Sequence, residues 1–213
     1  MHFITLLRHG VSEGNSKGVL QGQLDYPLSP TGEKQVHSLA TFWKSTGINF
    51  DLIISSPLQR ASQTAQVIAE KLKVPLEYDA LWKERNFGQL QGVSIDEINK
   101  RDPPVDFFHP YQPIGIDGES QLDLYTRASQ AIQNILWLPT GSYLVVSHGA
   151  ILNKFLYVIM GITPQAHYHS PIFHFNNTGY AQLRYNSVSC QWAVLCVNHQ
   201  VGLEEGSDIW QYD

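Results

Sequence analysis

Residues 1–15 read MHFITLLRHGVSEGN, an apolar run that ends in a charged pair, Arg8 and His9, and then continues in small and polar residues. The run over residues 3–7 has the composition of a buried strand. A cation and an imidazole are costly to bury unless a partner meets them. We therefore expect the strand to carry Arg8 and His9 at its end, where a ligand can reach both.

The composition limits the domain organisation and the kinds of partner that this chain can have. The chain has 213 residues, of which 43% are hydrophobic and 15% charged, which suits a single domain over residues 1–213 with a substantial core. No apolar run approaches the roughly 20 residues of a membrane span. The net charge is −5 and no basic tract is present, which argues against a nucleic-acid surface. We expect neither a membrane nor a nucleic acid as a partner.

Two cysteines, Cys190 and Cys196, lie in the apolar run CQWAVLC. In a strand they would lie about 20 Å apart on one face, whereas a disulfide needs Cα atoms within about 7 Å. Two free, buried thiols fit a reducing compartment, and we predict a cytoplasmic location.

Short apolar runs alternate with helical patterns along the chain. Ser29 and Ser56 are expected to cap helices whose first residues are Pro30 and Pro57. The expected strands are 3–7, 51–55, 74–80, 143–147, 173–186 and 189–198. One helix is expected to begin at residue 30, and the other expected helices span 56–72, 95–101, 120–138 and 150–161. Such alternation predicts an α/β fold, with a mostly parallel sheet covered by helices on both faces.

In such folds ligands bind beyond the carboxyl ends of the strands, where the strand order reverses. Arg8 and His9 follow the first strand, Arg60 follows the second and His148 follows the strand at 143–147. We expect these four side chains to converge into a cationic cluster. In an acidic protein such a cluster indicates a bound anion, and a phosphomonoester fits the fork of donors that arginine presents. No metal is expected, because no carboxylate or cysteine ligands accompany the histidines and arginines repel cations.

The segment 101–120, RDPPVDFFHPYQPIGIDGES, is too long for a simple connection. It is either a substrate-covering insertion or a locally ordered excursion. Its aromatic residues and His109 could pack or form a pocket wall; they are Phe107, Phe108, His109 and Tyr111. Two other polar stretches are interpreted as solvated surface: HYH at 167–169, and the C-terminal acidic residues Glu204, Glu205 and Asp208.

Five motifs occur in order: LLRHGVSEGN, SSPLQRASQTA, KERNFGQLQG, GES and VVSHG. In this order they resemble the histidine phosphatase superfamily, also called the phosphoglycerate mutase-like family. The resemblance covers nearly the whole chain. It implies a three-layer α/β/α sandwich with a mostly parallel, mixed central sheet, no cofactor, a small phosphorylated metabolite as substrate, and a homodimer as a common assembly.

The resemblance also implies roles for individual residues. His9 matches the nucleophile that becomes phosphohistidine, and Glu84 matches the general acid that protonates the leaving oxygen. The groups that clamp the phosphoryl oxygens are Arg8, Arg60 and His148. The residues matched to substrate binding are Ser12, Asn15, Gln21, Gly22, Arg85, Gly149 and Asn177.

Elementary chemistry agrees with these roles. A neutral imidazole can attack phosphorus through one nitrogen if an acceptor holds the N–H of the other. Two arginines and a second histidine can stabilise the equatorial oxygens. Glu84 could protonate the leaving alkoxide and then serve as base toward water. Gly10 is expected to let the backbone turn close beside the phosphate.

Hydrolysis and mutase activity share the transfer to His9 and differ in the acceptor. The stretch between Glu84 and His148 is short compared with that of the mutases, and residues 102–126 contain no Lys or Arg to hold a second phosphate. Phe87 stands where the mutases carry a tyrosine. We therefore expect a metal-independent phosphatase, with a 2,3-bisphosphoglycerate-dependent phosphoglycerate mutase as the alternative.

Arg85 follows Glu84 as it does in the mutases and could pair with an acidic group of a substrate, such as that of a phosphoglycerate. The alternative is that Arg85 merely pairs with a nearby carboxylate of the protein. A non-catalytic binding module is disfavoured, because Arg8, His9, Arg60, Glu84 and His148 are all present.

Overall fold

The structure is a computed structural model and describes residues 1–166 and 171–201. Its elements are β1 His2–Arg8, α1 Glu13–Ser16, α2 Pro30–Ser45, β2 Leu52–Ser55, α3 Gln59–Leu72, β3 Leu76–Tyr78, two 3₁₀ turns at Ala80–Trp82 and Gly88–Leu90, α4 Ile95–Asn99, α5 Gln121–Trp137, β4 Ser142–Ser147, α6 Gly149–Ile159, β5 Tyr180–Asn186 and β6 Gln191–His199. The positions His167, Tyr168, His169, Glu204, Glu205 and Asp208 lie outside the described residues.

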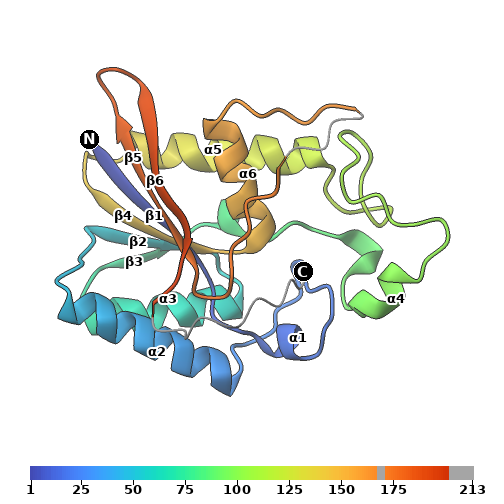
Figure 1. Ribbon diagram of the computed structural model, residues 1–213, viewed down its shortest axis with the longest axis horizontal. Helices are drawn as coiled ribbons and strands as arrows, with labels where there is room; N and C mark the ends of the chain where they lie inside the picture. Colours follow the sequence, from blue (N-terminus) through green and yellow to red (C-terminus); the bar gives the residue numbers. More distant parts are fainter. Residues whose placement is uncertain (167–170, 202–213) are drawn as a thin grey trace.

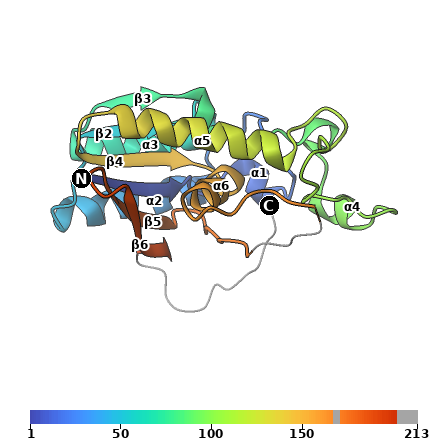
Figure 2. The same ribbon diagram turned by 90° about the horizontal axis from the view of Figure 1, so that it is seen from above.

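One sheet organises the molecule, with the strand order β3-β2-β4-β1-β5-β6. The first four strands of this order run parallel, and β5 and β6 are antiparallel to their neighbours. Helices α2 and α3 cover one face of the sheet, and α5 and α6 cover the other (Figures 1 and 2). The predicted three-layer sandwich with a mostly parallel, mixed sheet is confirmed.

Two hydrophobic clusters fill the layers between sheet and helices. Side chains of β1 alternate between them: Ile4 and Leu6 face α5 and α6, whereas Leu7 packs toward α2 and α3. A third, smaller cluster joins α4 to the chain around it and contains Leu20, Phe87, Leu90, Ile98 and Ile114. The central strands are therefore buried on both faces, which accounts for their unbroken apolar sequences.

The two predicted helix starts differ in outcome. Ser29 caps α2, and its side chain accepts the N–H of Gly32, with Pro30 as the first helical residue. Helix α3 starts only at Gln59, so the predicted cap at Ser56 is wrong. The Ser56 hydroxyl is used elsewhere, since it accepts the N–H of Leu58 at 3.3 Å and lies 2.8 Å from His148 Nε2.

The last two strands are shorter at their starts than the sequence predicts. β5 begins at Tyr180 rather than 173, because Thr178 adopts a positive φ of 59° and breaks the extended run. Cys190 lies in the turn before β6, where it is exposed, and Cys196 is half-buried; both are free. The expected burial of both thiols is therefore wrong, which removes support from the compartment inferred from it.

The segment 101–120 contains no helix or strand and lies beside α4, away from the sheet (Figure 1). Ile114 anchors it in the third hydrophobic cluster. None of the helices within the described residues has the length and apolarity that a membrane crossing requires.

Candidate active site

The ends of two adjacent parallel strands bring two histidines together. In the register of β1 and β4, Arg8 pairs with Ser147, so the next residue of each strand is a histidine. The rings of His9 and His148 are 5.1 Å apart between centroids and inclined by 60°. Both side chains are buried. The predicted convergence at the carboxyl edge of the sheet is thus present in the structure.

His9 is held in one tautomer. Its Nδ1 lies 2.7 Å from the carbonyl oxygen of Gly10, and a carbonyl can only accept, so Nδ1 carries the proton and Nε2 keeps its lone pair. Burial, Arg60 and Arg8 hold the pKa of His9 well below its usual value. At neutral pH His9 is therefore a neutral imidazole with a free nucleophilic nitrogen.

Arg60 lies in the first turn of α3 and is 1% exposed. Its guanidinium donates to the carbonyls of Leu24 and Gly22 at 2.8 and 2.7 Å. Burial lowers the pKa of Arg60 to about 10, which leaves the group charged at neutral pH. Within the described residues, Arg60 Nε and His148 Nδ1 are buried without a hydrogen-bond partner. An unsatisfied buried N–H on a guanidinium, such as Arg60 Nε, is the chemistry of an anion site.

Arg8 adds a second charge to this edge of the sheet. One of its terminal nitrogens donates to the carbonyl of Phe175 at 2.6 Å. Burial lowers the pKa of Arg8 to about 10, a shift that the nearby Glu84 carboxylate opposes, so the guanidinium also stays charged at neutral pH. Two buried guanidiniums therefore flank His9.

Glu84 holds two backbone donors with its carboxylate. Oε1 accepts the N–H of Arg85 at 2.8 Å, and Oε2 accepts the N–H of Ala150 at 3.2 Å. Ala150 is in the first turn of α6, where unpaired N–H groups and the helix dipole favour a negative charge. The carboxylate is half-buried and lines the same cavity as His9.

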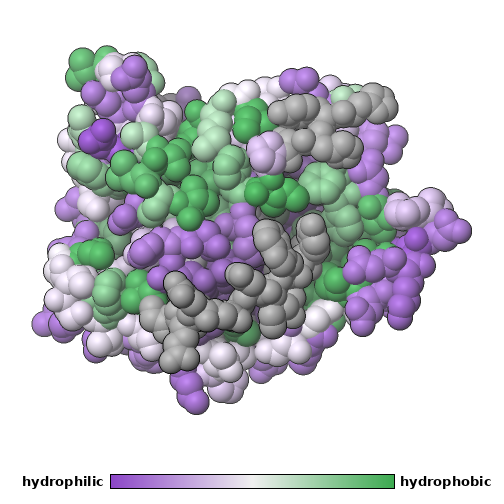
Figure 3. Space-filling model, viewed as in Figure 1, coloured by the Kyte–Doolittle hydropathy of each residue, from purple (hydrophilic) through white to green (hydrophobic). Residues whose placement is uncertain are grey.

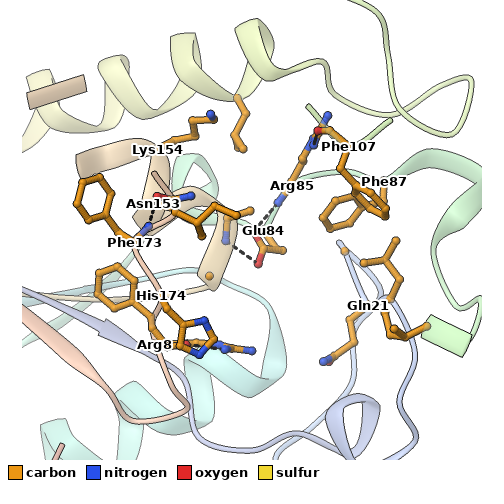
Figure 4. Close-up of a pocket in the computed structure, with 18 of the residues that line it drawn as sticks. Arg8, Gln21, Glu84, Arg85, Phe87, Phe107, Asn153, Lys154, Phe173 and His174 are labelled. Atoms are coloured by element: carbon orange, nitrogen blue, oxygen red, sulfur yellow. Dashed lines mark hydrogen bonds between the residues drawn. The ribbon is translucent and has the colours of Figure 1, made fainter. Parts of the chain in front are cut away.

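Four of the predicted substrate-binding residues line this cavity: Gln21, Gly22, Arg85 and Gly149. Figure 4 shows the Gln21 amide nitrogen pointing into the open space. The other three do not line the cavity. Ser12 and Asn15 form the capping box of α1, and Asn177 donates to the carbonyl oxygen of His9 at 3.0 Å. These three hold the backbone around His9.

Arg85 is largely engaged by the segment 101–120. Its Nε and one terminal nitrogen donate to the carbonyl of Glu119, and the other donates to the carbonyl of Phe107 at 2.7 Å. Its guanidinium also lies over the ring of Phe87, 5.5 Å from the centroid. These contacts are structural, but they are made to backbone carbonyls and not to the carboxylate that the sequence left open as a partner. They hold the insertion against the cavity, and Phe107 and Phe108 line that wall, whereas Tyr111 is exposed.

Gly10 lies where the loop after β1 packs on α2. A Cβ there would stand 2.8 Å from Val36 Cγ2 and 2.9 Å from the carbonyl oxygen of Gly32, both in α2. The glycine therefore permits close packing of the loop on α2, and its close approach to a phosphate stays a prediction. Thr64 completes the loop by accepting the N–H of Gly10 at 3.2 Å.

The cavity has a volume of about 350 Å³. Much of its lining was not predicted: one face of α6, with Ala150, Asn153, Lys154 and Tyr157, and the segment Ile172, Phe173, His174 and Phe175. The α6 residues recur at helical spacing from the turn that follows His148, a pattern that could have been read in the sequence. The segment before β5 carries no such pattern. Figure 4 shows Asn153, Lys154, Phe173 and His174 near Glu84.

Arg127 of α5 was also missed. It donates to the carbonyls of Leu81, Lys83 and Glu84 at 2.8, 2.6 and 3.2 Å, and it pairs with Glu119 at 2.7 Å. It therefore fixes the backbone that carries Glu84. The spacing of the sequence offers no signal for this contact, because its partners are backbone carbonyls about 40 positions away.

Within residues 1–166 and 171–201, no three His, Cys, Asp or Glu side chains gather as potential metal ligands.

Comparison with protein families agrees with the geometry. The family model described as "Histidine phosphatase superfamily (branch 1)" matches residues 4–199. The chain is 32% identical over 166 residues to "Uncharacterized phosphatase PhoE" of Bacillus subtilis, covering 78% of this chain and 81% of that protein. It is 34% identical over 170 residues to "Probable phosphoglycerate mutase GpmB" of Yersinia enterocolitica, covering 76% and 77%.

Two solved structures extend the likeness. "Bacillus stearothermophilus YhfR" superposes with a TM-score of 0.79 at 26% identity, covering 95% of this chain and 98% of that one. A mutant of phosphoserine phosphatase from Entamoeba histolytica, in complex with phosphoserine, superposes with a TM-score of 0.76 at 28% identity, covering 93% and 97%.

Proposed function

The chain belongs to the histidine phosphatase superfamily, and we propose that it is a metal-independent phosphatase that hydrolyses a small phosphomonoester through a phosphohistidine at His9. The observation that carries the proposal is the convergence of a neutral His9, two buried guanidiniums and a carboxylate on one cavity. A relative solved with phosphoserine supports a small phosphorylated metabolite as the substrate.

In the first step, His9 Nε2 attacks phosphorus and the bond to the ester oxygen breaks. The Gly10 carbonyl holds the Nδ1 proton, so the imidazole can accept the positive charge that develops on it. Arg8 and Arg60 stabilise the negative charge on the equatorial oxygens, and they are already buried and oriented by backbone carbonyls. The departing alkoxide takes a proton from the Glu84 carboxyl.

In the second step, water replaces the alcohol. The Glu84 carboxylate removes a proton from that water, which attacks the phosphohistidine and releases phosphate, and His9 returns to its neutral form. The two N–H groups on the carboxylate hold it beside the cavity in both steps. Each step moves one proton through the same carboxyl group, so the cycle leaves the enzyme unchanged.

Turnover of p-nitrophenyl phosphate in the presence of a chelator tests this function. We expect hydrolysis by the natural protein, and acid-labile phosphate on the protein after rapid quenching. His9→Ala should abolish both signals, whereas His37→Ala, at an exposed position on α2, should leave them unchanged. Activity that survives in His9→Ala would refute the mechanism.

A phosphoglycerate mutase is the second candidate, because a relative carries that name. Incubation with 3-phosphoglycerate, with and without 2,3-bisphosphoglycerate, separates the two. We expect free phosphate in both reactions, since residues 102–126 offer no Lys or Arg to retain a second phosphate. Bisphosphate-dependent formation of 2-phosphoglycerate with little free phosphate would favour the mutase. A cytoplasmic location and a homodimer stay predictions.

A further inference from the structure

Lys154 is a buried cation that the proposed reaction does not use. It lies on α6, lines the cavity and is 7% exposed. Its Nζ lies 4.1 Å from the centroid of the Tyr157 ring, and no hydrogen bond or ion pair joins it to a described residue. A cation–π contact offsets only part of the cost of burying an ammonium group.

The neighbouring charged side chains do not neutralise the ammonium group of Lys154 either. Burial and the nearby Arg85 lower the pKa of Lys154 to about 8, so the group is still mostly protonated at neutral pH. Among the described residues that line the cavity, Glu84 is the only carboxylate, and its oxygens already accept two backbone N–H groups, from Arg85 and Ala150. This end of the cavity therefore carries an excess of positive charge beyond the two arginines beside His9.

The position of Lys154 separates it from the phosphate site. It follows Ala150 by four residues on the same face of α6, which places it about 6 Å further along the helix axis. In Figure 4, Glu84 lies between Arg8 and Lys154. The walls around the cavity are largely apolar and include Leu124, Phe107 and Phe173. On the face seen in Figure 3, a hydrophilic band lies below a broad group of apolar side chains.

We propose that Lys154 binds a carboxylate on the organic part of the substrate, so that the enzyme prefers phosphomonoesters in which an apolar spacer separates the phosphate from a second anionic group. This inference rests on the proposed function for the phosphate site. A carboxylate would give the ammonium a charge-assisted hydrogen bond in a site shielded from water. Lys154 is then a specificity residue that does not touch the reacting atoms.

Matched phosphonates test this without requiring turnover. Three benzylphosphonates carry a carboxyl, carboxymethyl or carboxyethyl group in the para position, and each has a carboxamide counterpart of equal size. Calorimetry measures their binding to the natural protein, Lys154→Met, Lys154→Arg and a control, Lys71→Met, which removes an exposed charge on α3.

For the best spacer we expect the carboxylate to bind at least about tenfold more tightly than its amide to the natural protein. Lys154→Met should bring this ratio to about 1 and leave amide affinity within about twofold, whereas Lys154→Arg and Lys71→Met should keep the preference. The proposal is overturned if no spacer shows a preference, if the preference survives in Lys154→Met, or if that variant loses the amide ligands as well.

Hydrolysis of the corresponding aryl phosphates is measured separately. Lys154-dependent binding without any turnover would refute the phosphatase and leave the carboxylate site standing. Turnover without a preference would refute the carboxylate site alone. Failure of all six phosphonates to bind, together with no hydrolysis of the phosphates, would refute both.

Discussion

The Glu84 carboxylate holds the N–H groups of Arg85 and Ala150, one from its own loop and one from α6. These contacts are made by oxygen atoms that a glutamine could partly replace, so the position of the side chain and its acidity can be separated by mutation. Substitution by glutamine therefore distinguishes two roles of Glu84, one that only positions the substrate and one that protonates the leaving group.

For Glu84→Gln we expect kcat for an alkyl phosphate to fall about 10²- to 10⁴-fold, because an amide cannot protonate the alkoxide. With p-nitrophenyl phosphate, whose leaving group needs little protonation, the first turnover should be less impaired. The following hydrolysis should be slow, so that a burst of p-nitrophenolate appears in rapid-mixing experiments. Equal losses for both substrates and no burst would assign Glu84 to positioning.

Lys154 makes the preference for a carboxylate depend on pH. The charged side chains that line its cavity are Arg85 and Glu84 beside it and Arg8 and Arg60 at the phosphate site, and Tyr157 is its neighbour on α6. A lysine is charged below its pKa and neutral above it, and the pKa of Lys154 is lowered to about 8 in the empty cavity. We expect the carboxylate-to-amide affinity ratio to have its highest value at pH 6.5 and to fall as the pH rises beyond 8. Calorimetry across this range, with Lys154→Arg as a pH-independent control, measures it.

At the scale of elements, Arg127 connects α5 to two separate segments. It donates to three carbonyls between Leu81 and Glu84 and pairs with Glu119, which in turn accepts the N–H of Asn86 at 2.7 Å. The Arg127 and Glu119 side chains are only 15% and 18% exposed. This contact joins the acid-bearing loop, the insertion and a core helix into one unit.

Arg127→Met should lower the free energy of unfolding by about 2 kcal/mol, because it leaves Glu119 and three carbonyls without their donor in a mostly buried site. It should also lower kcat, since the backbone of Glu84 loses a support. Urea unfolding and steady-state kinetics measure these effects. Arg101→Met is the matched control. The Arg101–Glu97 pair is 3.8 Å apart and exposed, and its loss should cost less than about 0.5 kcal/mol. Equal effects of the two variants would show that Arg127 contributes no more than a surface charge.

At the scale of the whole molecule, the candidate site is assembled from residues of several separate elements. β1 supplies Arg8 and leads to His9, and β4 leads to His148. Helix α3 supplies Arg60, and the loop after β3 supplies Glu84. A phosphate bound there would hold these segments together and would stabilise the fold as a whole, because it binds only the folded arrangement.

Inorganic phosphate at about 100 times its dissociation constant should therefore add about 2.7 kcal/mol to the free energy of unfolding. Thermal unfolding at increasing phosphate, against sodium sulfate and sodium chloride at equal ionic strength, separates specific binding from general salt effects. Arg60→Met should lose the specific part, and a chelator should leave it unchanged. A Tm that responds to phosphate no more than to the other salts would contradict phosphate binding at the cluster.

The sequence predicted best those residues of the site that come at the carboxyl ends of apolar strands. Arg8, His9 and His148 follow strands of unbroken apolar residues, and parallel strands present their carboxyl ends at one edge. Their meeting could be inferred before any coordinates. Ser12, Asn15 and Asn177 were predicted near the substrate and instead support the backbone around His9, because sequence motifs report proximity and not the direction of a side chain.

The sequence by itself determined the layered fold and the residues that meet at the candidate phosphate site, because strand composition and residue spacing are local properties of the chain. Only the tertiary structure decided what lines the rest of the cavity. The insertion must fold back onto Arg85, and α6 must pack against α5, before Lys154 becomes a buried ammonium group in an apolar cavity. Burial and the loss of water around a charge arise from packing between distant segments, and no single segment of the sequence encodes them.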